Sequence, residues 1–313
     1  SATVWALGGS YDRFLEVHRD RYLADLAAGL VTENGAPFTT ALSNNGLADD
    51  FRGAFTSSLG SFGPNSFFAL PLPNWSVTYN GLSNWPLFRL LTTQMTVRHG
   101  YSATYDLDYR SDALAFAEGG SFENETIGGQ SFQVPVDARQ SQNVRLNERF
   151  QPLIGFNMTF RGGIQADVNF TQSRALSLSV AGANVSESTT DEVSVRLSFS
   201  KTGLRIPLPF VNRRRINNNV RMSLTFSTAN NSDQRLNFRQ DFLDTIAGAP
   251  RSPQTPEAST RLTLEPRVSY TISSQVTADV FVRYTSLESE GSRIPSTSTL
   301  NGGFNFRISF SGN

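Results

Sequence analysis

Few residues of this chain have the types and the spacing that catalysis would need. Its only histidines are His18 and His99; the first falls on an expected helix and the second on a long expected strand. A lone histidine in such a place is more often packed or hydrogen-bonded than catalytic. The sequence contains no cysteine, which excludes disulfides, thiolate metal ligands and cysteine nucleophiles. It therefore predicts no enzyme, no metal site and no cofactor.

Other polar clusters are explained most simply as solvated loops. Asp49 with Asp50, and Glu123 with Glu125, have no base or metal ligand at a suitable spacing. The paired glycines at 119–120 and 128–129 do not fall in a strand-to-helix turn, so they predict no phosphate-binding loop. The three arginines at 213–215 could bind an acidic partner, but a solvated loop is the simpler interpretation.

The largest group of polar residues that could act together is a set of arginines on the polar sides of the expected strands. They are Arg161, Arg196, Arg221, Arg235, Arg239, Arg261, Arg267, Arg283 and Arg307. Four carboxylates on the same strands offset them, namely Asp167, Glu192, Glu265 and Asp279. Guanidinium groups in a crowded interior need water or carboxylate partners. If the strands form a barrel, this side lines the lumen, and we expect a polar, arginine-rich conduit.

The elements that would position these arginines are strands. Residues 164–171 alternate between apolar and polar at every position, and the same alternation recurs at 192–199, 219–226 and 303–310. Because strand side chains point alternately to opposite sides, each run has one apolar and one polar face. Alternating runs of about ten residues separated by turn residues are typical of transmembrane β-barrels. The predicted fold class is all-β, a section of a transmembrane antiparallel β-barrel with a short N-terminal helix.

This interpretation assigns residues to the two faces of the barrel wall. The expected lumen-lining residues are Arg161, Asp167, Arg196, Arg221, Arg239, Arg267, Asp279, Arg283 and Arg307. The expected lipid-facing residues are Phe156, Phe160, Phe170, Phe199, Phe226, Val280, Phe304, Phe306 and Phe310. Aromatic residues end several apolar runs, as expected where a barrel wall meets the headgroups.

Charge and hydropathy restrict the partners. Acidic and basic residues balance at 27 each, so no excess charge indicates nucleic acid as a partner. No apolar run approaches the ~20 residues of a transmembrane helix. If the chain contacts a lipid bilayer, we expect it to do so through strands. Any export signal has been removed or lies upstream of Ser1.

The chain divides into two parts of different character. Residues 1–74 are expected to be helical and irregular, with a helix from about Tyr11 to Ala28 and a loop over 32–73, packed in the lumen or at the periplasmic rim. Residues 75–313 are expected to form consecutive antiparallel transmembrane strands. The helix prediction rests on one apolar stripe, formed by Phe14, Leu15, His18, Tyr22 and Leu26. After a long strand over 95–109 and a loop over 111–143, the expected strands are 144–149, 154–161, 164–181, 191–201, 219–227, 234–240, 259–272, 275–285 and 299–310.

The expected connections differ in length. Residues 228–233 and 273–274 are read as short turns, and residues 241–258 and 286–298 as long loops. Outer-membrane barrels have short periplasmic turns and long external loops. This pattern predicts a bacterial outer-membrane location with the C-terminus on the periplasmic side.

Two stretches resemble a known family. The segments PNWSVTYNGL, which begins at Pro73, and SRALSLSV, which begins at Ser173, are similar to the C-terminal region of the SprA/Sov family. The similarity continues more loosely through residues 260–284 to the closing strand. That family forms the outer-membrane translocon of the type IX secretion system in Bacteroidota.

The resemblance implies a very large single-chain barrel whose pore passes folded protein cargo. It implies a plug protein and a PorV-type outer-membrane shuttle as partners, and export of gliding-motility-type cargo. It implies no catalytic residue, because the family provides a conduit. Family members are several times longer than 313 residues, and about ten strands cannot enclose a pore for folded proteins. The remaining barrel strands would come from the same or a split polypeptide.

Two alternatives remain open from the sequence. The first is a self-contained small porin or uptake channel of about ten to twelve strands, in which the first and last strands pair. The second is a soluble β-sandwich that acts as an adhesin or carbohydrate-binding module. Its strands would show the same alternation, with the apolar side turned inward.

Overall fold

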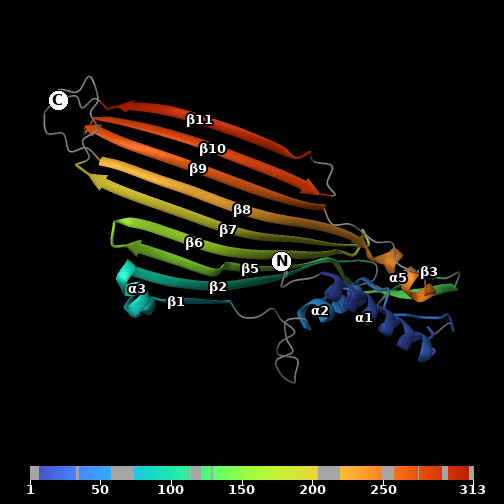
Figure 1. Cartoon of the computed structure of the whole chain (residues 1–313). Coiled ribbons are helices and arrows are strands. Elements are labelled where there is room, and N and C mark those ends of the chain that lie inside the picture. The colour runs from blue at the N-terminus through green and yellow to red at the C-terminus, as the bar shows by residue number, and fades with distance from the viewer. Residues whose placement is uncertain are drawn as a thin grey trace.

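The chain forms one large antiparallel sheet with a few helices at its ends (Figure 1). The computed structural model describes residues 7–32, 35–57, 74–111, 113, 121–127, 130–203, 219–248, 257–273, 275–290 and 295–309. The predicted all-β class is therefore confirmed, whereas closure of the sheet into a barrel stays a prediction. No helix in these described ranges is long and apolar enough to cross a membrane.

The main sheet has nine strands, and strands that follow one another in the chain are neighbours in the sheet. They are β1 (Trp75–Tyr79), β2 (Thr92–Ser111), β5 (Arg139–Phe160), β6 (Ile164–Ser179), β7 (Asn184–Thr202), β8 (Asn219–Asn237), β9 (Glu257–Ser273), β10 (Val276–Glu290) and β11 (Thr297–Ile308). The strands β3 (Ser121–Ile127) and β4 (Gln130–Val136) form a separate hairpin between β2 and β5. β1 and β11 are the two edges of the main sheet.

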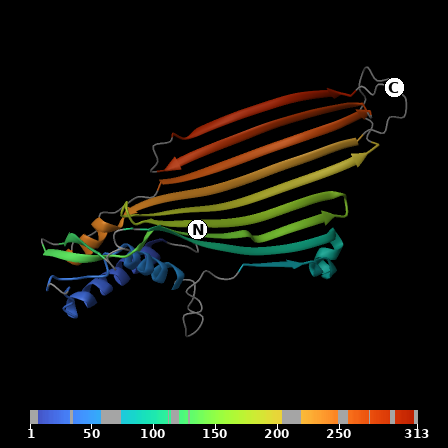
Figure 2. The same ribbon diagram turned by 180° about the vertical axis from the view of Figure 1, so that it is seen from behind.

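The two ends of the sheet differ. One end, here called the turn end, holds the tight connection at 161–163, the end of β9 and the start of β10, together with η2 (Gly81–Asn84) and α3 (Pro86–Leu91). The opposite end, here called the cap end, holds α1 (Leu7–Ala27), α2 (Asn44–Ser57), α5 (Phe238–Ala247) and the β3–β4 hairpin (Figure 2). The C-terminal end of β11 and the helical cap therefore lie at opposite ends of the sheet (Figure 1).

Several predicted boundaries are wrong in the same way. The expected strands 144–149 and 154–161 are one strand, β5, whose register with β6 shifts between Phe150 and Ile154. The expected strands 219–227 and 234–240 are also one strand, β8, so the predicted short turn at 228–233 does not exist. Its polar residues continue the ladder with β7, because backbone hydrogen bonds do not depend on side-chain polarity.

The predicted loops also contain regular structure. The 111–143 segment includes β3, β4 and the start of β5, and the 32–73 segment includes α2. The 241–258 loop begins inside α5, whose N-cap residue Asn237 accepts a hydrogen bond from the backbone N–H of Gln240. Gly248 ends this helix in the left-handed conformation.

The helical cap packs on the apolar face of the sheet. The predicted first helix is confirmed as α1, and its Phe14, Leu15 and Tyr22 are buried. The rings of Phe51 in α2 and Phe238 in α5 meet the Phe14 ring edge-on, at centroid distances of 5.8 and 5.9 Å. The sheet contributes the buried side chains of Val144, Leu146, Leu176, Leu178, Val185 and Leu236 to this core. These helices thus lie on the face opposite to the expected lumen.

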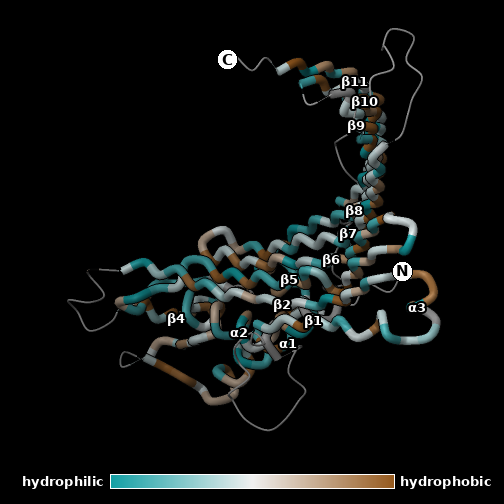
Figure 3. The backbone as a smooth tube through the Cα atoms, turned by 90° about the vertical axis from the view of Figure 1, so that its left-hand side faces the viewer, coloured by the Kyte–Doolittle hydropathy of each residue, from teal (hydrophilic) through white to brown (hydrophobic). Residues whose placement is uncertain are grey.

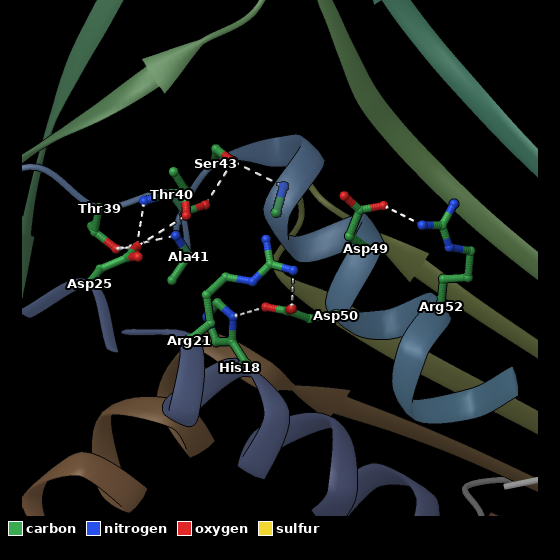
Figure 4. A network of polar contacts seen from close by, with 11 residues as sticks. His18, Arg21, Asp25, Thr39, Thr40, Ala41, Ser43, Asp49, Asp50 and Arg52 are labelled. Carbon is green, nitrogen blue, oxygen red and sulfur yellow. Dashed lines mark hydrogen bonds and ion pairs between the residues drawn. The ribbon is translucent and has the colours of Figure 1, made fainter. Parts of the chain in front are cut away.

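One acidic pair in the cap differs from the expectation that both members are solvated. Asp50 is buried between α1 and α2, where it lies 2.9 Å from His18 Nδ1 and 2.8 Å from Arg21 Nη2 (Figure 4). Asp49 is half exposed and forms an ion pair with Arg52. The loop interpretation failed because it missed α2, which carries Asp50 into the interface with α1.

The edge strand β11 has a tight contact that can be tested. Gly303 faces the ring of Phe281 across the β10–β11 ladder, and a Cβ added at Gly303 would lie 2.6 Å from that ring. We expect Gly303→Ala to lower the free energy of unfolding by about 1–3 kcal/mol, because the ring must move. Gly302→Ala is the control, since its Cβ would meet its nearest atom at 3.5 Å. Equal denaturant midpoints for the two variants would contradict this packing.

Candidate functional site

Each strand contributes one apolar and one polar row to the sheet, and these rows are continuous. One row crosses all nine strands and is apolar or aromatic throughout: Tyr79, Val97, Phe156, Val168, Val195, Phe226, Leu264, Tyr284 and Leu300. The next row, on the other face, is Thr78, Arg98, Gly155, Asn169, Ser194, Ser227, Thr263, Thr285 and Thr299. The sheet therefore has one apolar face and one polar face.

The sheet curls when seen from its end, and α1 and α2 lie on its convex side (Figure 3). These helices pack on the apolar face, so the polar face is the concave one. A hollow of about 1230 Å³, here called the main hollow, lies on it, lined chiefly by polar residues of β5 to β9. A second hollow of about 740 Å³ lies closer to the cap and is lined by Arg145, Ser177, Ser188, Asp233 and Arg235 among others. The helices of the cap lie on the opposite, convex side.

Most of the residues predicted to line a lumen lie on this concave face. They are Asp167, Arg196, Arg221, Arg267, Asp279, Arg283 and Arg307. Two do not. Arg161 lies in the β5–β6 turn and donates to the carbonyl oxygen of Arg89 from Nε and Nη2, at 3.2 and 2.9 Å. Arg239 lies on α5, not on a strand, and forms an ion pair with Glu125 of β3.

Asp167 organises one side of the main hollow. Its carboxylate accepts hydrogen bonds from Arg98 Nη2 at 3.3 Å and from Asn157 Nδ2 at 2.9 Å, and Asn169 also donates to it. Arg98 comes from β2, so this network joins β2, β5 and β6. Sequence analysis missed Arg98, although it follows Val97 in an alternating run.

Glu265 organises the other side. It accepts from Arg267 Nη2 at 3.0 Å and from Arg283 Nε at 2.5 Å, so one carboxylate joins two guanidinium groups of β9 and β10. Arg267 also lies over the ring of Phe281, 5.2 Å from its centroid. These groups are partly exposed, so their mutual attraction is screened and they remain accessible to a ligand.

The convex face holds the residues predicted to face lipid. Phe156, Phe160, Phe170, Phe199, Phe226, Val280, Phe304 and Phe306 lie on it, and Phe310 lies outside the described residues. The side chains of Phe304 and Phe306 are 66% and 51% exposed. None of these eight side chains belongs to the described core that the sheet forms with α1, α2 and α5, although all eight are apolar.

The height of the apolar band can be estimated from β9. Its outward residues from Leu262 to Tyr270 span roughly 27 Å along the strand. At a strand tilt of ~40°, this is about 20 Å across a bilayer, close to the ~25 Å apolar band of outer-membrane barrels.

A buried charge cluster separates the apolar band from the cap, and sequence analysis did not find it. Arg174 Nε donates to Glu187 Oε1 at 2.6 Å, and Arg174 Nη1 lies 3.8 Å from Glu148 Oε2. The hydroxyl of Tyr101 donates to Glu148 Oε1 at 2.9 Å. The signal was present, because Gln172 and Arg174 interrupt the apolar side of an otherwise alternating run.

The arrangement offers positive charge and hydroxyl and amide groups in a concave hollow. His99 Nδ1 lies 2.6 Å from the backbone oxygen of Leu153, consistent with a hydrogen-bonded strand histidine. No group of three or more histidine, cysteine, aspartate or glutamate residues is placed to hold a metal ion among the residues that the structure describes. Its guanidinium groups can form charge-assisted hydrogen bonds with anionic groups.

Comparison with protein-family models and with curated proteins finds no match to this chain.

Proposed function

We propose that this chain is the C-terminal section of a SprA-like outer-membrane translocon and contributes consecutive strands to a large protein-conducting barrel. The proposal combines the resemblance of the sequence to the SprA/Sov family with the two faces of the sheet. The convex face contacts lipid, and the concave arginine-bearing face lines a hydrated passage. The cargo is secreted protein, and the partners are a plug protein and a PorV-type shuttle.

The observation that carries the membrane part is the apolar row that crosses all nine strands and is half-buried or exposed on every one of them. A soluble β-sandwich has the same alternation, but a second sheet covers its apolar face. Here many side chains of the band are exposed. Apolar surface in contact with water is unfavourable in free energy, whereas the same surface in contact with lipid is not. Lipid contact is therefore the better explanation.

The two edges of the sheet favour the interpretation that the chain is a section of a larger barrel over the interpretation that it is a self-contained porin. β1 and β11 end the sheet on opposite sides, and β11, twelve residues long, has no second strand partner among the residues that the structure describes. An edge of this length, without proline or lysine, readily pairs with a further strand. The remaining barrel strands would pair with both edges.

The cap has a defined place in this proposal. With the C-terminus and the tight turns on the periplasmic side, α1, α2 and α5 lie at the external rim. They pack against the outside of the barrel wall, above the apolar band. This differs from the lumenal or periplasmic position expected for residues 1–74, because α1 and α2 dock on the apolar face.

Electron microscopy of the detergent-extracted native complex tests the size of the barrel. We expect a ring with far more strands than the nine described here. A closed ring of about ten to twelve strands would overturn the translocon proposal and leave a small channel.

The lipid contact can be tested separately, because the chain contains no cysteine. Ser194→Cys and Val195→Cys place single thiols on adjacent residues of β7 that face opposite sides. In proteoliposomes, we expect a membrane-impermeant maleimide to label position 194 at least about tenfold faster than position 195, because lipid shields the latter and keeps its thiol protonated. Equal labelling rates would contradict a lipid-facing convex side.

A further inference from the structure

We propose that the main hollow binds an extended acidic segment of polypeptide through Arg196 and Arg221. The inference rests on the proposed function, because it names the class of chain that the concave face accepts. The evidence for it is that, among the described residues, no carboxylate of the hollow forms an ion pair with either of these two guanidinium groups.

The carboxylates of the main hollow are already engaged. Asp167 lies opposite Arg196 in the β6–β7 register, but its carboxylate bonds with Arg98 and Asn157 instead. Glu265 is shared between Arg267 and Arg283. Among the residues that the structure describes, neither Arg196 nor Arg221 forms an ion pair, and both are exposed on the concave face. The hollow and its bonded neighbours thus hold five arginines against two carboxylates.

The spacing of the two free arginines favours an extended chain over a small anion. Arg196 faces Thr225 on β8, and Arg221 lies four residues before Thr225 on the same strand. At ~3.3 Å per residue and ~4.8 Å between strands, their backbone positions are about 14 Å apart. One carboxylate or phosphate spans much less than this. Two carboxylates at positions i and i+4 of an extended peptide are about 13 Å apart and fall on the same side.

The rest of the lining suits a peptide backbone. Ser198 and Ser223 present hydroxyl groups between the two arginines, and Ser194 and Thr225 add hydroxyl groups beside Arg196. Asn157 and Gln165 add amides on the neighbouring strands. Such groups both donate and accept, so they can satisfy the N–H and C=O groups of an extended chain. Each arginine can bind a carboxylate bidentately, which would fix the register of the peptide.

Fluorescence anisotropy with the detergent-extracted native complex that carries this chain, reconstituted in nanodiscs, tests the inference. The probe is an eleven-residue Gly/Ser peptide with glutamate at positions i and i+4. Two control peptides have lysine in place of both glutamates, or the two glutamates at adjacent positions. We expect the Arg196→Gln/Arg221→Gln variant to bind the probe at least about tenfold more weakly, because both charge-assisted contacts are lost. Arg235→Gln/Arg307→Gln is the control, because it removes two other concave-face charges and is expected to change affinity by less than about twofold.

The outcomes separate this inference from the proposed function. Three results would overturn the acidic-peptide site. They are an equal loss of peptide affinity in both double variants, equal binding of the lysine peptide, and complete competition by inorganic phosphate at millimolar concentration. A large ring without specific peptide binding would overturn this inference alone. Specific peptide binding by a small closed ring would overturn the translocon alone.

Discussion

Replacing Arg174 with methionine is expected to lower the free energy of unfolding by about 3–5 kcal/mol. The guanidinium lies between two carboxylates, those of Glu148 and Glu187, and all three side chains are at most 3% exposed. Methionine fills a similar volume but leaves two buried negative charges without a cation. The remaining hydrogen bond from Tyr101 to Glu148 is too weak to offset this loss.

The measurement is urea unfolding of the reconstituted protein, followed by tryptophan fluorescence. Trp75 is a suitable reporter, because its ring stacks on Tyr101 at a centroid distance of 4.5 Å. The control is the triple variant Glu148→Gln/Arg174→Met/Glu187→Gln, which removes all three charges and should recover most of the lost stability. If Arg174→Met alone unfolds within about 1 kcal/mol of the parent, the cluster is not buried in the folded protein.

The central strands were the part of the fold that the sequence predicted best. The expected strand at 164–181 corresponds to β6, that at 191–201 falls within β7, and that at 275–285 overlaps β10 except for its first residue. Their apolar and polar residues alternate strictly, because one side of each strand forms part of the apolar band and the other side lines the polar hollow. The strands extend beyond the predicted ends where the band stops, since residues 184–190 and 228–237 are polar on both faces or nearly so.

The cap was predicted in part, although the sequence contained more of its signal. Leu47, Phe51 and Ala54 of α2 are buried and recur at helical spacings of four and three residues. In α5, Asn237 and Gly248 are ordinary helix-ending residues at the correct places. α2 was missed because its stripe is short and lies among glycine, serine and asparagine, whereas the start of α5 was assigned to the expected strand 234–240.

The location of the cap could not be predicted from local pattern. Leu176 and Leu178 continue the apolar side of β6, so they look like further lipid-facing residues. The structure covers them with α1, α2 and α5, which come from segments far apart in the sequence. Periodicity shows which face is apolar, whereas the partner that covers each part of that face depends on long-range packing.

In the candidate site, too, local pattern predicted which face a residue lies on, whereas the partner of each residue depended on long-range structure. The side of the strand that carries Asp167, Arg196 and Arg267 followed from alternation alone. The pairing of Arg98 with Asp167, and of two arginines with Glu265, depends on strand order and register. Arg196 and Arg221 stand out only after those pairs are known, because the sequence cannot show which carboxylate is already occupied.

Introducing arginine at Leu224 is expected to lower the free energy of unfolding in lipid by about 2–4 kcal/mol. Leu224 lies on the convex side of β8, in the middle of the apolar band, and its neighbour Ser223 lies on the concave side. A guanidinium at position 224 must enter hydrocarbon or draw water and headgroups toward it. The measurement is the urea-unfolding free energy of the protein in thin-bilayer vesicles.

Two matched variants show whether lipid is the cause. Ser223→Arg places the same charge in the hydrated hollow and should change the unfolding free energy by less than about 1 kcal/mol. Thr228→Arg places it at the edge of the band on the same face as Leu224, where the cost should fall to about 0–1 kcal/mol. In a soluble sandwich, the cost at position 224 would follow packing and would persist without lipid or detergent. A cost that falls with distance from the middle of the band therefore identifies the bilayer as the solvent of the convex face, because no packed protein core grades its penalty by membrane depth.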